Sequence, residues 1–287
     1  MARIGIIGGS GLYQIDGLTN IEERRIDTPF GAPSDAFMLG DLEGKPVVFL
    51  PRHARGHRLS PTEVNYRANI YGMKMLGVSH IISVSAVGSL RADYWPGDVV
   101  IIDNFFDRSN QARPNTFFGD GIVAHVQMAH PLCADLRQIL LMAGREADAN
   151  IRSGGTYLNM EGPQFSTLAE SKIFRTWGLD VIGMTQMSEA RLAREAEICY
   201  ATMALVTDFD CWHEEEAAET VSVDMILKVM NKNTATAKEI LKLAIPNVNV
   251  ENNCSCQSAL AVSLVTDKTL WPEQTVEKLK PIIKKYL

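Results

Sequence analysis

Short apolar runs alternate with longer amphipathic segments along most of the chain. The runs are rich in β-branched residues and are bounded by turn residues or charges, which is typical of buried strands. They cover residues 3–9, 45–51, 79–86, 97–103, 180–185 and 199–208. The pattern therefore predicts a buried β-sheet whose strands are spread over some two hundred residues of sequence.

Helical spacing fills the intervals between these runs. It is found in residues 60–76, 130–147, 167–177, 188–197 and 222–245. Ser60 with Pro61, and His130 with Pro131, are expected to begin the first two helices, and Ser222 is expected to cap the last. Alternating strands and helices predict an α/β fold in which helices flank a central mixed β-sheet.

The length of 287 residues favours one domain spanning residues 1–287, with a tail of about residues 250–287 packing on it. The formal net charge is −6, without a compensating Lys/Arg-rich run, which argues against nucleic acid and against an anionic membrane as partners. No apolar stretch reaches the roughly 20 residues of a membrane helix, and the first residues lack a signal-peptide pattern. We therefore expect a cytoplasmic protein that binds small molecules.

The five cysteines are not spaced like a disulfide framework or like a zinc site. Cys254 and Cys256 are the one pair close in sequence, and a reducing cytosol favours free thiols there, so we expect a structural or incidental role. The paired carboxylates of Asp208 and Asp210 could bind a divalent metal, but the sequence contains no further carboxylate cluster spaced to complete such a site. We assign no metal.

Ligands of α/β proteins bind at the carboxyl ends of the strands, so the residues that end each run are the candidates for a site. Those residues are Gly8 to Gly11, Arg52 with His53, Ser85 with Ala86, Met184 with Thr185, and Asp208 to Asp210. The glycines lack the third glycine of a dinucleotide fingerprint and the Lys-Ser/Thr of a P-loop. A tight turn alone would explain them, but it would not require the hydroxyl of Ser10.

Hydroxyls, backbone N–H groups and a guanidinium at neighbouring strand ends suit an inorganic phosphate. A single strand-end arginine such as Arg52 is more often a surface charge or a partner in an ion pair, so the prediction of a phosphate site depends on the combination of these groups.

Asp208 and Asp210, at i and i+2, would share a face of a strand end. Like charges held close raise at least one pKa, which favours a proton donor near neutral pH, although acids at this place are also common helix caps. Phe165, in "MEGPQFST", offers a flat face for a heterocycle or is an ordinary core residue.

Many motifs occur in an order that fits one family. They include "GIIGGSGL", "DTPFGAPSD", "RHARGH", "VNYRANIYGMK", "EGPQFST" and "VTDFDCW", and together they cover most of residues 3–245. On these motifs the chain resembles the trimeric purine nucleoside phosphorylase family, and within it the branch that acts on 5′-deoxy-5′-methylthioadenosine. The resemblance implies the nucleoside phosphorylase fold and a pentosyltransferase of purine and methionine salvage. Its reaction would be phosphorolysis to adenine and 5-methylthioribose 1-phosphate, with phosphate as co-substrate and no organic cofactor.

The resemblance also implies roles for individual residues. Phosphate would be held by Ser10, Arg52, His53, Ser85, the amide of Ala86, and Thr185. The nucleoside would be held by Met184 under the ribose with Gly183 beside it, Phe165 against the purine, Asp208 as proton donor to N7, and Asp210 as acceptor from the 6-amino group. The 5′ pocket would be lined by Val221, Val223 and Ile226, with His125 reaching it from a neighbouring subunit of a homotrimer or of a hexamer made of two trimers.

Three alternatives stay open. Relatives that prefer 6-oxopurines carry Asn where Asp208 stands, so a phosphorylase of broader or 6-oxopurine preference, acting on adenosine, inosine or methylthioinosine, is the nearest one. A nucleoside hydrolase would carry Glu where Thr185 stands. A dinucleotide-binding module would bind NAD without turnover.

The sequence departs from the family pattern at several places, and these leave finer preferences open. Serine replaces the threonine of animal relatives at positions 10 and 85, Gln164 stands for Arg, Gly183 for Asn and Ser188 for Pro. The preference among nucleosides, and a disulfide between Cys254 and Cys256 as in some bacterial and archaeal relatives, are not settled by the sequence.

Overall fold

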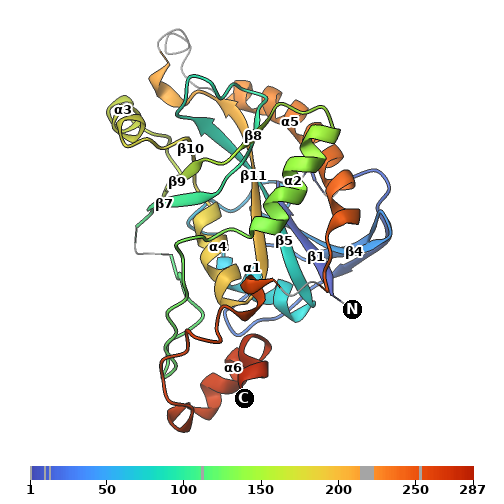
Figure 1. Cartoon of the computed structure of the whole chain (residues 1–287), viewed down its shortest axis with the longest axis vertical. Helices are drawn as coiled ribbons and strands as arrows, with labels where there is room; N and C mark the ends of the chain where they lie inside the picture. Colours follow the sequence, from blue (N-terminus) through green and yellow to red (C-terminus); the bar gives the residue numbers. More distant parts are fainter. Residues whose placement is uncertain (1, 10, 13, 111–112, 214–222, 252–253) are drawn as a thin grey trace.

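The computed structural model describes residues 2–9, 11–12, 14–110, 113–213, 223–251 and 254–287, with only the helical backbone for residues 223–228. In this part of the chain, eleven strands form one sheet (Figure 1). The strands are β1 (Arg3–Gly8), β2 (Thr19–Arg24), β3 (Phe37–Leu42), β4 (Lys45–Pro51), β5 (Val78–Ser89), β6 (Val99–Ile101), β7 (Asn104–Arg108), β8 (Ile151–Ser153), β9 (Thr156–Met160), β10 (Val181–Gly183) and β11 (Cys199–Asp208).

The sheet is mixed, as the sequence predicts. Its main path runs β2, β3, β4, β1, β5, β10, β9, β7, while β11 pairs with β5 and β6, and β8 pairs with β6. The pairs β4–β1, β1–β5 and β5–β11 are all parallel. β10 runs antiparallel to the last residues of β5. The parallel strands therefore end at one common edge of the sheet.

Helices cover both faces of this sheet (Figure 1). They are α1 (Tyr66–Met75), α2 (Ala134–Glu146), α3 (Leu168–Thr176), α4 (Gln186–Glu195), α5 (Val223–Ala244) and α6 (Glu273–Ile283). β11 shows how the core is divided, because its side chains alternate between the faces. Tyr200 and Ala204 pack in the cluster that contains α1 and α4 residues, whereas Ala201 and Met203 pack in the cluster that contains α2 and α5 residues.

Two helices begin later than the sequence predicts. Asn65, not Ser60, caps α1, because its side-chain oxygen accepts a hydrogen bond from the N–H of Ala68 at 3.1 Å. Ser60 instead bonds Glu63 within a preceding turn. The second helix begins after Cys133 rather than at His130. The predicted cap Ser222 lies outside the described residues.

Strands and a helix that the sequence reading missed lie mainly at the sheet margins and in the tail. β2, β3, β7, β8 and β9 are short or partly exposed, so they lack the long apolar runs of central strands. In the tail, α6 packs on α1, where the Tyr71 hydroxyl donates to the carbonyl of Lys278 at 2.8 Å. None of the helices described is both long enough and apolar enough to cross a membrane.

Candidate active site

An open stretch of β5 forms the floor of the candidate site. β1 pairs with β5 as far as Ser83, and β10 pairs with it at Gly88 and Ser89. Between these pairings, residues 84–87 of β5 have no partner strand on that side within the described part of the sheet. Ser85 and Ala86 lie in this gap, where backbone N–H groups and a hydroxyl are available to an anion.

Strand ends β4 and β10 flank this gap. The N–H of Arg52 donates to the carbonyl of Gly8 at 3.0 Å, which holds the end of β4 beside the end of β1. β10 approaches the gap from the end of β5, because the two strands are antiparallel: Val181 pairs with Ser89 and Ile182 with Gly88. Thr185 thereby becomes the buried N-cap of α4. A helix N-terminus favours a bound anion.

The guanidinium of Arg52 is buried and ion-paired. It donates to both carboxylate oxygens of Glu189, to the Ser83 hydroxyl at 2.6 Å and to the carbonyl of Val84 at 3.1 Å. The negative charge of Glu189 raises the pKa of Arg52, and Ser83 and Tyr200 donate further hydrogen bonds to the same carboxylate. Arg52 is therefore held rigidly, with most of its donors already occupied.

His53 is neutral at physiological pH. Burial and the neighbouring charge of Arg52 lower its pKa to about 4. Its Nδ1 lies 2.8 Å from the carbonyl of Leu59, which can only accept, so Nδ1 carries the proton and Nε2 is an acceptor. In this state His53 can accept a hydrogen bond from a protonated phosphate oxygen.

Asp208 and Asp210 lie beside the same stretch of β5. Asp208 accepts from the Thr207 hydroxyl at 2.7 Å and from the N–H of Asp210 at 2.8 Å. Gly88 leaves room for this carboxylate, because a Cβ there would lie 2.9 Å from Asp208 Oδ1. Asp208, at the end of β11, pairs with Gly88, which lies two residues after Ala86 on β5.

Burial and the charge of Asp208 raise the pKa of Asp210 to about 6, against the lowering effect of a hydrogen bond from Ser171. The Ser171 hydroxyl donates to Asp210 Oδ2 at 2.5 Å. Asp210 also has a φ of 50°, which is uncommon for a residue with a Cβ and is tolerated by aspartate. The predicted rise of one pKa in the pair is therefore present, and it lies on Asp210.

Gly183 and Met184 connect β10 to α4. The ring of Tyr157 fills the space beside Gly183, and Met184 packs over Gly162. The carbonyl of Met184 accepts from Arg113 at 2.6 Å, and the same guanidinium donates to the carbonyl of Glu161 at 2.6 Å. Arg113 thus joins the loop after β9 to the end of β10.

The remaining predicted residues are distributed as follows. Phe165 is 52% exposed, so it is not the core residue that the sequence also allowed. His125 is exposed, and its N–H bonds Ser263 in the tail, so within one chain it is not brought to the acid pair. Ser10 and Val221 lie outside the described residues, and Val223 and Ile226 are described only as helical backbone.

Several residues that hold the site were missed from the sequence. Glu189 directly follows Ser188, a position compared above with the family pattern, which was a usable signal, but Arg113 and Tyr157 lie outside the motifs of the family resemblance. Ser188, where the pattern has Pro, lies 3.4 Å from Arg113 through its hydroxyl. These residues act on the site through buried contacts that no local spacing reveals.

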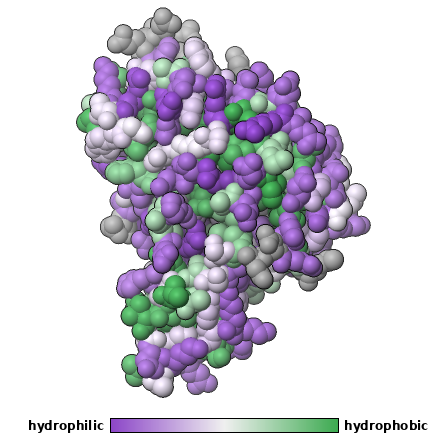
Figure 2. Space-filling model, viewed as in Figure 1, coloured by the Kyte–Doolittle hydropathy of each residue, from purple (hydrophilic) through white to green (hydrophobic). Residues whose placement is uncertain are grey.

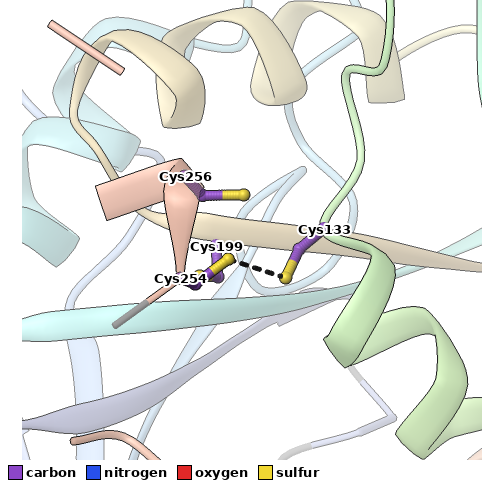
Figure 3. Close-up of side chains that lie close together, drawn as sticks. All are labelled: Cys133, Cys199, Cys254 and Cys256. Atoms are coloured by element: carbon purple, nitrogen blue, oxygen red, sulfur yellow. Dashed lines mark hydrogen bonds between the residues drawn. The ribbon is translucent and has the colours of Figure 1, made fainter. Parts of the chain in front are cut away.

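The structure also brings together cysteines that lie far apart in the sequence. Cys133 and Cys199 join Cys254 and Cys256 within a single cluster (Figure 3). Sequence spacing could not show this, because 121 positions separate Cys133 from Cys254.

Comparison with known proteins defines the class to which this fold and site belong. Residues 3–246 match the model of the phosphorylase superfamily. The S-methyl-5'-thioadenosine phosphorylase of Geobacter sulfurreducens is 57% identical over 284 residues, covering 99% of both chains. That of Koribacter versatilis is 53% identical and covers 99% of this chain and 97% of its own.

Solved structures agree. A methylthioadenosine phosphorylase from an antarctic soil metagenomic library superposes with a TM-score of 0.92 at 50% identity, covering 98% of each chain. The Schistosoma mansoni enzyme in complex with adenine gives a TM-score of 0.84 at 37% identity, covering 92% of this chain and 99% of that one. The chain therefore belongs to the phosphorylase superfamily and, within it, to the family of the methylthioadenosine phosphorylases. This confirms the predicted family and the nucleoside phosphorylase fold.

Proposed function

We propose that this enzyme catalyses phosphorolysis of 5′-methylthioadenosine to adenine and 5-methylthioribose 1-phosphate. Inorganic phosphate is the co-substrate, and no organic cofactor takes part. One observation carries the proposal: the anion-binding gap at Ser85–Ala86 and the acid pair Asp208–Asp210 lie next to each other along β5. The names of the relatives support the choice of nucleoside.

Phosphate binds in the gap, against the Ser85 hydroxyl, the N–H of Ala86 and the Thr185 hydroxyl at the N-terminus of α4. Cleavage of the ribosyl C–N bond builds positive charge on the sugar, and a phosphate anion held beneath it stabilises that charge. Arg52 and His53 complete this side of the site, together with Ser10. Because Glu189 already neutralises Arg52, the N–H and hydroxyl dipoles supply much of the attraction.

The acid pair serves the purine. The leaving base accumulates negative charge, which a proton delivered to N7 relieves. We assign that donation to Asp208 and acceptance from the 6-amino group to Asp210. The pKa of Asp210, raised by burial and by the charge of Asp208, supports a proton kept by the pair near neutral pH. Phe165 stacks on the base, and Met184 with Gly183 lies against the ribose.

The 5′ methylthio group requires an apolar pocket, which we assign to Val221, Val223 and Ile226. His125 completes this pocket from a neighbouring subunit of a homotrimer, or of a hexamer of two trimers. The tail that contacts the His125 segment exposes Val262 and Val265, and apolar atoms gather on this end of the molecule (Figure 2). Such a patch fits a subunit interface. The five free cysteines fit a cytoplasmic enzyme of purine and methionine salvage.

The decisive experiment measures product formation with and without phosphate. Methylthioadenosine, adenosine and methylthioinosine are compared side by side, with base and sugar phosphate both quantified. We expect phosphate-dependent release of adenine, fastest from methylthioadenosine. Equal rates without phosphate would indicate a hydrolase, and a preference for methylthioinosine would overturn the assignment of Asp208 and Asp210 to the 6-amino group.

A further inference from the structure

Four cysteine side chains converge at the end of the sheet away from the acid pair (Figure 3). The Sγ atoms of Cys133, Cys199, Cys254 and Cys256 all lie within 4.8 Å of one another, and those of Cys133 and Cys254 lie 3.6 Å apart. All four are free thiols, and three of them are buried. The phosphorolysis proposed above uses none of them.

Separate elements of the fold hold the four sulfurs in place. Cys133 is the N-cap of α2, and its N–H donates to the carbonyl of Tyr200 at 2.8 Å. Cys199 is the first residue of β11 and pairs with His80 of β5. Cys254 and Cys256 belong to the short 3-10 helix over Ser255–Ser258 and its cap, where the N–H of Gln257 donates to the carbonyl of Cys254 at 2.9 Å. The cluster is therefore anchored by backbone contacts on every side.

The spacing of the sulfurs fits a tetrahedral thiolate site. Zinc–sulfur bonds of about 2.3 Å place the sulfurs of a regular tetrahedron about 3.8 Å apart. The Cys133–Cys254 separation of 3.6 Å is close to this value. The other sulfur–sulfur separations are within 4.8 Å, so small side-chain movements would bring all four sulfurs to tetrahedral spacing. Four sulfur donors select a soft or borderline metal and not magnesium or calcium.

The surroundings suit the charge of such a site. Zinc with four thiolates carries a net charge of −2, and the Arg194 guanidinium donates to Cys256 Sγ at 3.8 Å. His80 interacts electrostatically with Cys133 and with Asp135.

We propose that Cys133, Cys199, Cys254 and Cys256 bind one Zn²⁺ per chain in a closed, structural tetrathiolate site. Binding releases the thiol protons to solvent, and no atom changes oxidation state. The site is not catalytic, because the ten residues of β11 run from Cys199 to Asp208 and place about 30 Å between the ends of the strand. Its effect is to fasten the segment after residue 253 to the start of β11 and to α2.

The first test uses the wild-type protein, purified under reducing conditions without a metal-affinity step. We expect one zinc per chain by elemental analysis. After anaerobic removal of the metal, Co²⁺ should give the charge-transfer and visible bands of tetrahedral thiolate coordination, and Zn²⁺ should displace it. Failure of the reduced protein to bind either metal would overturn the proposal. So would a disulfide found within the cluster in fresh, alkylated cell extract, because it would remove the ligands.

The second test compares two single Cys→Ser variants. Cys133→Ser should lose the metal and show a lower melting temperature, whereas Cys211→Ser, the one cysteine outside the cluster, should keep one zinc per chain. Added Zn²⁺ should raise the melting temperature of metal-free wild type, because a ligand that binds only the folded state stabilises it. Equal zinc content in both variants would contradict the assignment, and the wild-type Co²⁺ titration decides the matter if Cys133→Ser does not fold.

Discussion

The hydroxyl of Tyr157 occupies the place that a side chain at Gly183 would need. A Cβ at position 183 would lie closer to the Tyr157 oxygen than any nonbonded contact allows. Tyr157 is fully buried. Gly183 is therefore required by its neighbour and not by its own backbone angle. The departure from the family's asparagine at this position is thus coupled to the aromatic residue on β9.

Replacing this glycine tests the coupling. We expect Gly183→Ala to lower the free energy of unfolding by about 1–3 kcal/mol, the usual cost of overpacking a core, and to reduce kcat/KM because Met184 would shift. In a Tyr157→Leu background the same substitution should cost much less. A double-mutant cycle by denaturant unfolding measures this. Additive effects of the two substitutions would contradict the proposed contact.

The Arg52–Glu189 ion pair yields a prediction about phosphate. Glu189→Gln leaves the buried guanidinium without its counter-charge. In phosphate-free buffer we therefore expect the free energy of unfolding to fall by about 3 kcal/mol, with a lower melting temperature. A bound phosphate replaces the missing charge, so phosphate should raise the melting temperature of the variant more than that of wild type. Thermal unfolding in phosphate and in chloride of equal ionic strength measures this.

A matched substitution controls for the loss of a glutamate charge. Glu23 pairs with Arg55 at the exposed surface, 2.9 Å apart, so Glu23→Gln should change stability little and leave the phosphate response unchanged. If Glu189→Gln and wild type respond equally to phosphate, Arg52 does not belong to the phosphate site.

The central fold could be predicted because its signals are local. β11 is a continuous apolar run, and α3 carries a complete capping box between Thr167 and Glu170, so the type and place of both follow from sequence. β2 could not be predicted, because its six residues are largely exposed and include three charged side chains. They adopt a strand conformation because they pair with β3. Tertiary pairing decides such edges, and local pattern does not contain it.

The site divides in the same way. Arg52, Thr185 and Asp210 follow apolar runs, so the rule that ligands bind at strand ends finds them. Ser171 and the four-cysteine cluster depend on contacts between distant segments, since 39 positions separate Ser171 from Asp210. The antiparallel pairing of β10 with β5 also could not be seen in the sequence, because it involves only Ser89 and Gly88 of β5, while β10 pairs in parallel with β9.

A shared site between subunits predicts complementation. His125→Ala should raise KM for methylthioadenosine while changing kcat little, because the residue is assigned to the 5′ group and not to the reacting bond. Mixing unfolded His125→Ala with unfolded Asp208→Asn protein, which is expected to have low activity, and refolding should produce hybrid oligomers that contain some intact sites. Activity above the average of the separate variants is expected, and strictly additive activity would show that each chain completes its own site.

The acid pair predicts opposite pH shifts from two neighbouring substitutions. The protonated pair is the active form, so kcat/KM should fall as pH rises above about 6, the pKa to which burial and Asp208 raise Asp210. Ser171→Ala removes a hydrogen bond that favours the charged carboxylate, so the pKa should rise and the fall should begin at higher pH. Asp208→Asn removes the charge that raises this pKa, so the fall should begin at lower pH, with lower activity throughout. Profiles of kcat/KM against pH at one phosphate concentration give both shifts relative to wild type, so the ionisation of phosphate itself cancels. Shifts of the same sign, or unshifted profiles, would mean that the proton of this pair does not control the reaction.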